Sequence, residues 1–141
     1  MKLVYLSDYI TQNNINIVWL QETNLHKLKK ITLSGYKCYR KDRGTIRKGG
    51  GVVIFIDSNI IHFPLPTVCY DFEIDVIGVS VNLNKGKYIK IKSFYNPRGE
   101  TDILDIFEKE TVGGKALILG EFNVHSPLWE VTTYENKAGK V

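Results

Sequence analysis

The sequence has 141 residues, a formal net charge of +4 and a composition that is 43% hydrophobic and 24% charged, which is typical of one compact globular domain. Its two cysteines, Cys38 and Cys69, lie far apart and form no CxxC pair, so we expect reduced thiols and neither a disulfide framework nor a thiolate zinc site. The longest apolar run, residues 52–56, is far below the ~20 residues of a membrane-spanning helix, and residues 1–14 lack the apolar core of a secretion signal, so we expect an intracellular protein without a membrane segment.

The first predicted elements are a helix and a strand. Apolar residues recur at helical spacing between residues 2 and 12, and an Asn-Asn pair then breaks the pattern. Residues 15–20 are almost all apolar and rich in β-branched side chains, which predicts a strand covered on both faces. A polar triplet follows directly, so the sequence places the carboxylate of Glu22 at the end of a strand.

The middle of the chain predicts further strands. Residues 36–40 form a short strand pattern, and a basic stretch then leads through a run of three glycines into a strand over residues 52–57. Residues 74–83 and 88–95 are separated by a turn sequence, which predicts an antiparallel hairpin. Because two apolar residues adjoin at Val76 and Ile77, the alternation changes phase there and predicts a β-bulge.

The last predicted elements are a helix and a strand. Thr101 can cap a helix that reaches about Glu110, and Gly113-Gly114 follows it. The predicted buried stripe of this helix consists of Ile103, Leu104, Ile106 and Phe107. Residues 115–120 form a buried strand pattern. Many strands with few helices, and no repeat or linker, predict an α/β or α+β sandwich in which residues 1–141 form one domain.

Polar side chains at the predicted strand ends carry the candidate chemistry. Glu121 and Asn123 are two residues apart, so in extended chain they project to the same side. Tyr95 offers a phenol at a third strand end. Hydrolysis of a phosphodiester needs a group that neutralises its anionic oxygens, and Mg²⁺ held by one or two carboxylates meets that need. The sequence therefore indicates a site in which Glu22 holds the ion.

Several segments match a known family in the same order along the chain. They are residues 18–23 (VWLQET), 49–54 (GGGVVI), 93–97 (SFYNP), 119–129 (LGEFNVHSPLW) and 136–139 (NKAG). The sequence resembles the apurinic-like endonuclease domain of non-LTR (LINE-type) retrotransposons, a branch of the endonuclease/exonuclease/phosphatase superfamily. The Pro-Leu-Trp end of the fourth segment resembles that branch's GDFNAHHPLWG motif, which is the most diagnostic of these matches.

The resemblance implies roles for individual residues. Glu22 resembles the metal-binding glutamate, with Mg²⁺ or Mn²⁺ as cofactor, Tyr95 the active-site tyrosine, and Asn123 the asparagine that orients the phosphate. Glu121 stands where the family has aspartate. The added methylene moves the carboxylate by about 1 Å, an error that can cost roughly 10²-fold in rate.

The resemblance also implies a four-layer sandwich of two packed β-sheets flanked by helices, and an incomplete one here. The family begins with a strand that bears an asparagine and ends with an aspartate and a Ser-Asp-His type motif, none of which has a counterpart in this sequence. We therefore expect residues 1–141 to be a partial domain, truncated at both ends. We expect a monomer unless exposed strand edges drive association.

DNA is the partner that the resemblance implies, and the modest positive charge agrees with a polyanionic ligand. The basic residues that could contact phosphates are Arg40, Lys41, Arg43, Arg47 and Lys48, together with His125. A charge run of this kind is equally often a solvated face.

The leading hypothesis is a Mg²⁺-dependent DNA endonuclease of the kind that nicks target DNA during retrotransposition, nuclear if functional and inactive if truncation has disrupted it. Two alternatives stay open. One is a catalytically dead remnant that binds nucleic acid, and the other is a phosphatase of the same superfamily that acts on a phosphorylated small molecule.

Overall fold

The computed structural model describes residues 3–42, 49–67, 70, 74–98 and 103–125. Its elements in chain order are α1 (Leu3–Gln12), β1 (Ile17–Leu20), β2 (Tyr36–Lys41), β3 (Val52–Asp57), β4 (His62–Pro64), β5 (Asp75–Asn82), β6 (Tyr88–Tyr95), α2 (Ile103–Thr111) and β7 (Ala116–Glu121). Each of these except β4 was predicted, to within about two residues at each end, an ordinary error for helix and strand boundaries. None of the helices in these ranges is long and apolar enough to cross a membrane.

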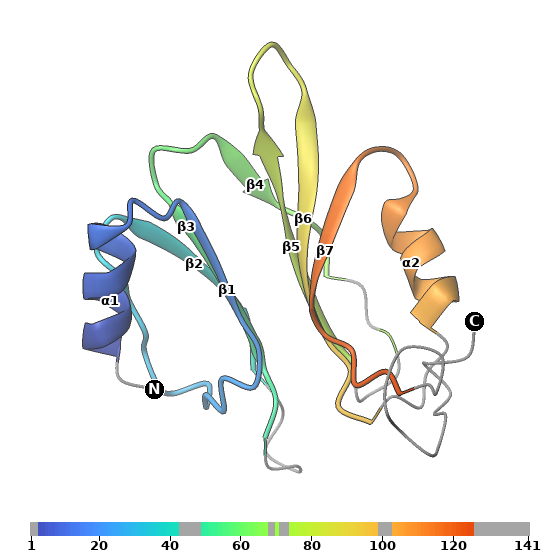
Figure 1. Cartoon of the computed structure of the whole chain (residues 1–141), viewed down its shortest axis with the longest axis horizontal. Helices are drawn as coiled ribbons and strands as arrows, with labels where there is room; N and C mark the ends of the chain where they lie inside the picture. Colours follow the sequence, from blue (N-terminus) through green and yellow to red (C-terminus); the bar gives the residue numbers. More distant parts are fainter. Residues whose placement is uncertain (1–2, 43–48, 68–69, 71–73, 99–102, 126–141) are drawn as a thin grey trace.

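The strands form two sheets that face each other (Figure 1). One is an antiparallel sheet with the order β1-β3-β2, and the other has the order β4-β5-β6-β7. In the second sheet β6 and β7 are parallel, because α2 carries the chain back between them, while the other neighbours are antiparallel. Helix α1 covers the outer face of the first sheet and α2 that of the second. The predicted four-layer α+β sandwich is confirmed.

The central strand β3 shows why these segments are apolar almost throughout. Its residues from Val52 to Ile56 are fully buried. Ile54 packs between the sheets with Val79 of β5, whereas Phe55 points outward to Ile10 of α1. Because successive side chains point to opposite faces, a strand covered on both sides needs an unbroken apolar run.

The outer face of the second sheet is closed by α2. Ile103 and Ile106 are buried against it, and Phe94 of β6 stacks on Phe122 with ring centroids 5.1 Å apart. The prediction that Leu104 belongs to the buried stripe was wrong, because its side chain is 50% exposed. The predicted capping residue, Thr101, lies outside the described residues.

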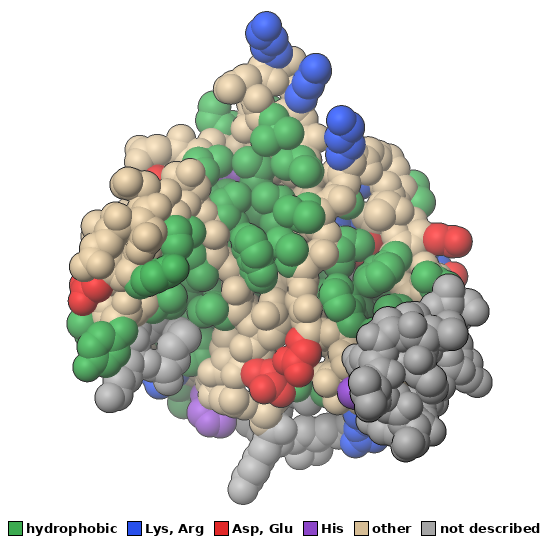
Figure 2. Space-filling model, viewed as in Figure 1, with side chains coloured by type: hydrophobic (Ala, Val, Ile, Leu, Met, Phe, Trp, Pro, Cys, Tyr) green, Lys and Arg blue, Asp and Glu red, His purple; other side chains and the backbone are tan. Residues whose placement is uncertain are grey.

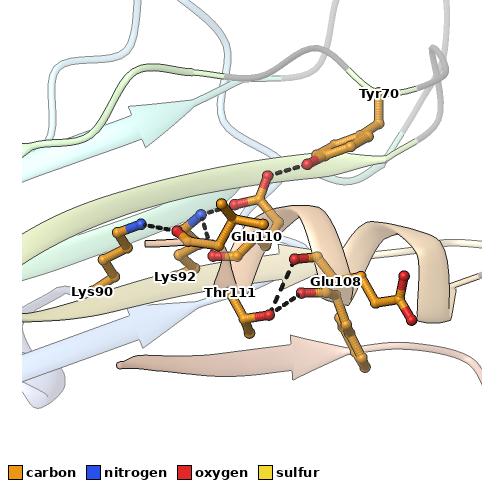
Figure 3. A network of polar contacts seen from close by, with 8 residues as sticks. Tyr70, Lys90, Lys92, Glu108, Glu110 and Thr111 are labelled. Carbon is orange, nitrogen blue, oxygen red and sulfur yellow. Dashed lines mark hydrogen bonds and ion pairs between the residues drawn. The ribbon is translucent and has the colours of Figure 1, made fainter. Parts of the chain in front are cut away.

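A small polar network fixes α2 on the sheet (Figure 3). The ammonium group of Lys92 forms an ion pair with Glu110, whose side chain is 5% exposed, and Tyr70 donates a hydrogen bond to the same carboxylate. Nζ of Lys92 also donates to the Glu110 carbonyl oxygen at 3.1 Å, and Nζ of Lys90 donates to that of Val112 at 2.6 Å. Burial, together with the charge of Lys90, lowers the pKa of Lys92. Both lysines therefore also satisfy carbonyl groups at the end of the helix.

Two other predictions are corrected. The pairing of β5 with β6 runs in unbroken register, so no β-bulge occurs at Val76 and Ile77. Both residues are apolar because Val76 packs toward α2 while Ile77 packs between the sheets. In the described part of the chain β1 pairs on one side only, with β3, and Trp19 is 38% exposed, so this strand is not covered on both faces.

The cysteine prediction can be followed at one position. Cys38 is a free, half-buried thiol in the layer between the first sheet and α1, and burial raises its pKa. Cys69 lies outside the described residues.

Candidate active site

The candidate residues meet at one end of the sandwich. Strands β1, β6 and β7 all end there, although β1 belongs to one sheet and the other two to the second (Figure 1). Figure 2 shows acidic side chains at this end of the molecule, below a band of hydrophobic side chains that lies over the space between β1 and β7. Glu22, which follows β1, and Glu121, which ends β7, are both exposed.

The segment that carries Glu22 is held against the glycine run. The amide N–H of Thr23 donates to the Gly51 carbonyl oxygen at 3.2 Å, and that of Asn24 donates to the Gly50 carbonyl oxygen at 2.9 Å. Gly50 and Gly51 have φ angles of 87° and 89°, which only glycine adopts without strain. The glycine run predicted from the sequence thus serves as a backbone cradle for the residues that follow β1.

Glu22 makes a direct contact with Tyr95. The phenolic hydroxyl of Tyr95 donates to Oε1 of Glu22 at 2.6 Å, and the tyrosine side chain is otherwise buried in the core between the sheets. A second link between the sheets lies beside it, where Nε2 of Gln21 donates to the hydroxyl oxygen of the buried Ser93 at 3.2 Å. The end of β1 is therefore tied to β6 through two side chains in succession.

Asn123 is joined to the same strand end from the other side. In the parallel pair, Tyr95 lies opposite Glu121, and the N–H of Asn96 donates to the Glu121 carbonyl oxygen at 2.9 Å. The amide Nδ2 of Asn123 then donates to the Asn96 carbonyl oxygen at 2.8 Å. The structure thus brings the four predicted positions to one end of the two sheets.

Two of these residues have unusual backbone geometry. Glu22 and Asn123 both have φ angles of 48°, in the left-handed region that residues other than glycine seldom occupy. Such conformations cost about 1–3 kcal/mol each and persist where the surrounding structure enforces them. Their occurrence at both strand ends indicates that side-chain placement here has been kept at the expense of stability.

The donor set determines which ion fits. In the parts of the chain that the structure describes, no group of three or more His, Cys, Asp or Glu side chains could hold a metal ion. That rules against a zinc-type cluster within those parts. Mg²⁺ instead keeps several waters and takes one or two carboxylates. Glu22, exposed and next to a phenol, fits such an ion.

Comparison with known proteins identifies the fold. No family model matches the sequence. The RNA-directed DNA polymerase from mobile element jockey of Drosophila melanogaster is 25% identical over 129 residues, which cover 89% of this chain and 13% of that protein. The endonuclease domain of TRAS1, a telomere-specific non-LTR retrotransposon, matches with a TM-score of 0.65 and 13% identity over 96% of this chain. The chain has the endonuclease/exonuclease/phosphatase fold.

The predicted resemblance to the endonuclease branch of this superfamily is confirmed. A humanized TDP2 from D. rerio also matches, with a TM-score of 0.58 and 14% identity over 87% of this chain and 55% of that chain. The chain spans 59% of the TRAS1 endonuclease domain.

The basic residues predicted to contact DNA have internal partners where they can be seen. Arg40 forms an ion pair with Asp42 at 2.5 Å and also donates to two backbone carbonyl groups, at 2.6 and 2.9 Å. Lys41 forms an ion pair with Asp75 at 3.4 Å. These contacts weaken the prediction that the two side chains grip phosphate. His125 is half-buried, and Arg43, Arg47 and Lys48 lie outside the described residues.

Two residues of this end of the endonuclease-like fold were missed by sequence reasoning. Gln21 forms the link to β6 described above, and Asp75 is a buried acid at the start of β5. A signal for Asp75 was present, because it lies between the apolar residues Ile74 and Val76 in a strand. A charged residue in such a place is rarely buried without a partner.

Proposed function

We propose that this chain is a DNA endonuclease-like domain of the retrotransposon type, which hydrolyses phosphodiester bonds with the aid of a divalent metal ion. The observation that supports it best is the hydrogen bond between Tyr95 and Glu22, with Asn123 joined to the same strand end. One carboxylate, one phenol and one amide from separate strand ends there form a group that suits an anionic, metal-bound phosphate.

The proposed roles follow from the chemistry of each group. Glu22 holds Mg²⁺ or Mn²⁺, which supplies positive charge against the phosphate oxygens. The hydroxyl of Tyr95 orients that carboxylate and lies within reach of the same phosphate. Nδ2 of Asn123 donates to a phosphate oxygen or to the attacking water. Glu121 accepts the proton of that water, with a carboxylate one methylene further out than in the family.

The proposed substrate is DNA and the proposed site of action is the nucleus. Both extend to this chain what is printed of the jockey and TRAS1 proteins, one named a polymerase of a mobile element and the other an endonuclease domain of a retrotransposon. Because phosphate contacts dominate the binding of DNA, we expect affinity to fall steeply with salt.

Nicking of supercoiled plasmid tests the proposal. With the full chain and Mg²⁺ we expect open-circular product, none in the presence of EDTA, and a loss of about 10²-fold or more in Glu22→Gln. The matched control is Glu108→Gln on α2, an equally exposed carboxylate away from the site. Activity that survives Glu22→Gln, or that falls equally in both variants, would remove Glu22 from the mechanism.

A second candidate function is DNA binding without catalysis, favoured by Glu121 at the position where the family has aspartate. Retention of plasmid in a salt-sensitive complex, with no nicking at any Mg²⁺ concentration, is the result that it predicts. Release of inorganic phosphate from a phosphorylated small molecule, without nicking, is the result that a phosphatase of the same superfamily predicts.

A further inference from the structure

The proposed site is divided between two sheets, and a buried carboxylate bridges them. Glu22 follows β1 in the first sheet, whereas Tyr95 and Asn123 come from strands of the second. Asp75 lies at the start of β5, opposite Tyr95 in the antiparallel register, and is 4% exposed. Its partners are in the first sheet and the glycine run that enters it. Relative motion of the sheets at this end would separate the two halves of the site.

The contacts of Asp75 lead directly to the segment of Glu22. Oδ2 of Asp75 accepts a hydrogen bond from the N–H of Gly51 at 3.1 Å. The carbonyl oxygen of the same Gly51 accepts the N–H of Thr23, the residue next to Glu22. One peptide unit of glycine therefore stands between the carboxylate on the second sheet and the backbone that carries the proposed metal ligand.

A lysine completes the bridge. Nζ of Lys41 on β2 lies 3.4 Å from Oδ1 of Asp75 and donates to the Ile74 carbonyl oxygen at 3.1 Å. The side chain of Lys41 is 28% exposed and that of Asp75 is 5% exposed. Because both oxygens of the carboxylate have a partner in the first sheet, its direction is fixed at two points, which a single hydrogen bond would not achieve.

We propose that Asp75 is a positioning residue of the proposed site, which holds the Glu22 segment at the distance from β6 at which Tyr95 and Asn123 can act with it. Asp75 acts through Gly51 and Thr23. The catalytic consequence rests on the function proposed above, whereas the alignment of the segment does not.

The competing interpretation is that the Asp75–Lys41 pair only stabilises the core. The chain contains a matched pair for that comparison, because Lys92 and Glu110 form a largely buried ion pair that starts from the same sheet and ends on α2 (Figure 3). Loss of that pair should lower stability without touching the backbone near Glu22. A residue that only stabilises the fold gives the same result at both pairs.

Amide hydrogen exchange of the full chain measures the alignment directly. In Asp75→Ala we expect the amides of Thr23 and Asn24 to exchange about tenfold faster or more, relative to amides in the middle of β3, since their acceptors lie on the released glycine run. The Lys41→Met/Asp75→Ala double variant gives the same readout without an uncompensated buried ammonium, should the single variant fold poorly. The control is Lys92→Met/Glu110→Ala. Unchanged exchange in the Asp75 variants, or an equal change in the control, overturns the proposal.

Nicking kinetics test the consequence. We expect the Asp75 double variant to lose about tenfold or more in kcat at saturating Mg²⁺ while KM for DNA changes by less than about threefold, and the control to keep both values. A uniform loss in both variants would leave only a structural role. If the wild-type chain does not nick at all, the proposed endonuclease function fails, and the exchange measurement still decides whether Asp75 aligns the Glu22 segment.

Discussion

The hydroxyl of Tyr95 donates a 2.6 Å hydrogen bond to Oε1 of Glu22, although the two residues are 73 positions apart in the chain and belong to different sheets. The contact fixes one oxygen of an otherwise exposed carboxylate and leaves the second oxygen for another ligand. Its length is that of a charge-assisted bond, which is stronger than a hydrogen bond between neutral groups. It therefore determines where a bound cation would lie relative to the core.

Removal of this hydroxyl should affect chemistry more than folding. In Tyr95→Phe the ring still fills its place between the sheets, so we expect a loss of only about 1 kcal/mol in the free energy of unfolding. We expect kcat for plasmid nicking to fall by about 10²-fold, because Glu22 loses its fixed direction and the phosphate loses a donor. Urea unfolding and nicking of the same preparation measure both. A variant with full activity would show that the hydroxyl only satisfies the carboxylate.

Substitution of Glu121 by aspartate tests the departure from the family. Glu121→Asp shortens the side chain by one methylene at a position opposite Tyr95, and restores the residue that the resemblance expects there. We expect nicking to increase by about tenfold or more, with little change in stability because the side chain is exposed. Glu121→Gln is the control, and should abolish the increase. Equal rates for all three proteins would remove this residue from water activation.

Gly120 is required by the pairing of β6 with β7. A Cβ atom at this position would overlap the backbone carbonyl of Phe94, which lies opposite in the register. We expect Gly120→Ala to cost about 3 kcal/mol or more, since neither backbone can move without breaking the parallel pair. Gly78→Ala is the matched control within the same sheet, because the nearest atoms to its added Cβ are side-chain carbons at 3.0 Å, which can shift. A similar melting temperature for both variants would contradict this explanation.

The sequence predicted much of the fold because burial on both faces leaves a readable pattern. The run from Val52 to Ile56 predicted a covered strand, and that strand is β3, the centre of the first sheet. The strand ends that carry Glu22, Tyr95 and Asn123 were predicted for the same reason, since an apolar run stops where the chain leaves the core. Their meeting at one end came from the family resemblance, and the structure agrees with it.

The features that were not predicted depend on contacts between distant segments. Leu104 matches the helical period, yet α2 covers too narrow a strip of the sheet to bury it. Trp19 lies in an apolar run, but β1 pairs on one side only in the described residues. The ion pair of Lys41 with Asp75 requires the two sheets to be brought together, and no local pattern encodes that distance. A sequence pattern indicates burial, not the partner.

The tether between β2 and the start of β1 gives a prediction for alkaline pH. The hydroxyl of Tyr36 donates to the Ile15 carbonyl oxygen at 2.5 Å, and burial together with the charge of Asp57 raises its pKa. The folded chain thus holds this proton more tightly than the unfolded chain. The stabilisation is fully present below the unfolded value of about 10 and is lost as pH rises through the higher folded value. Phenylalanine has no such proton.

We therefore expect wild type to exceed Tyr36→Phe by about 1 kcal/mol in the free energy of unfolding at pH 7, and this difference to shrink steadily above about pH 10. Urea unfolding of both proteins between pH 7 and pH 11 measures it, and effects of all other groups cancel in the difference. Tyr9→Phe on α1, where the side chain is 60% exposed, is the control and should follow wild type at every pH. A constant difference between wild type and Tyr36→Phe would mean that the hydroxyl ionises equally easily in both states, and that the bond to Ile15 contributes nothing to holding its proton.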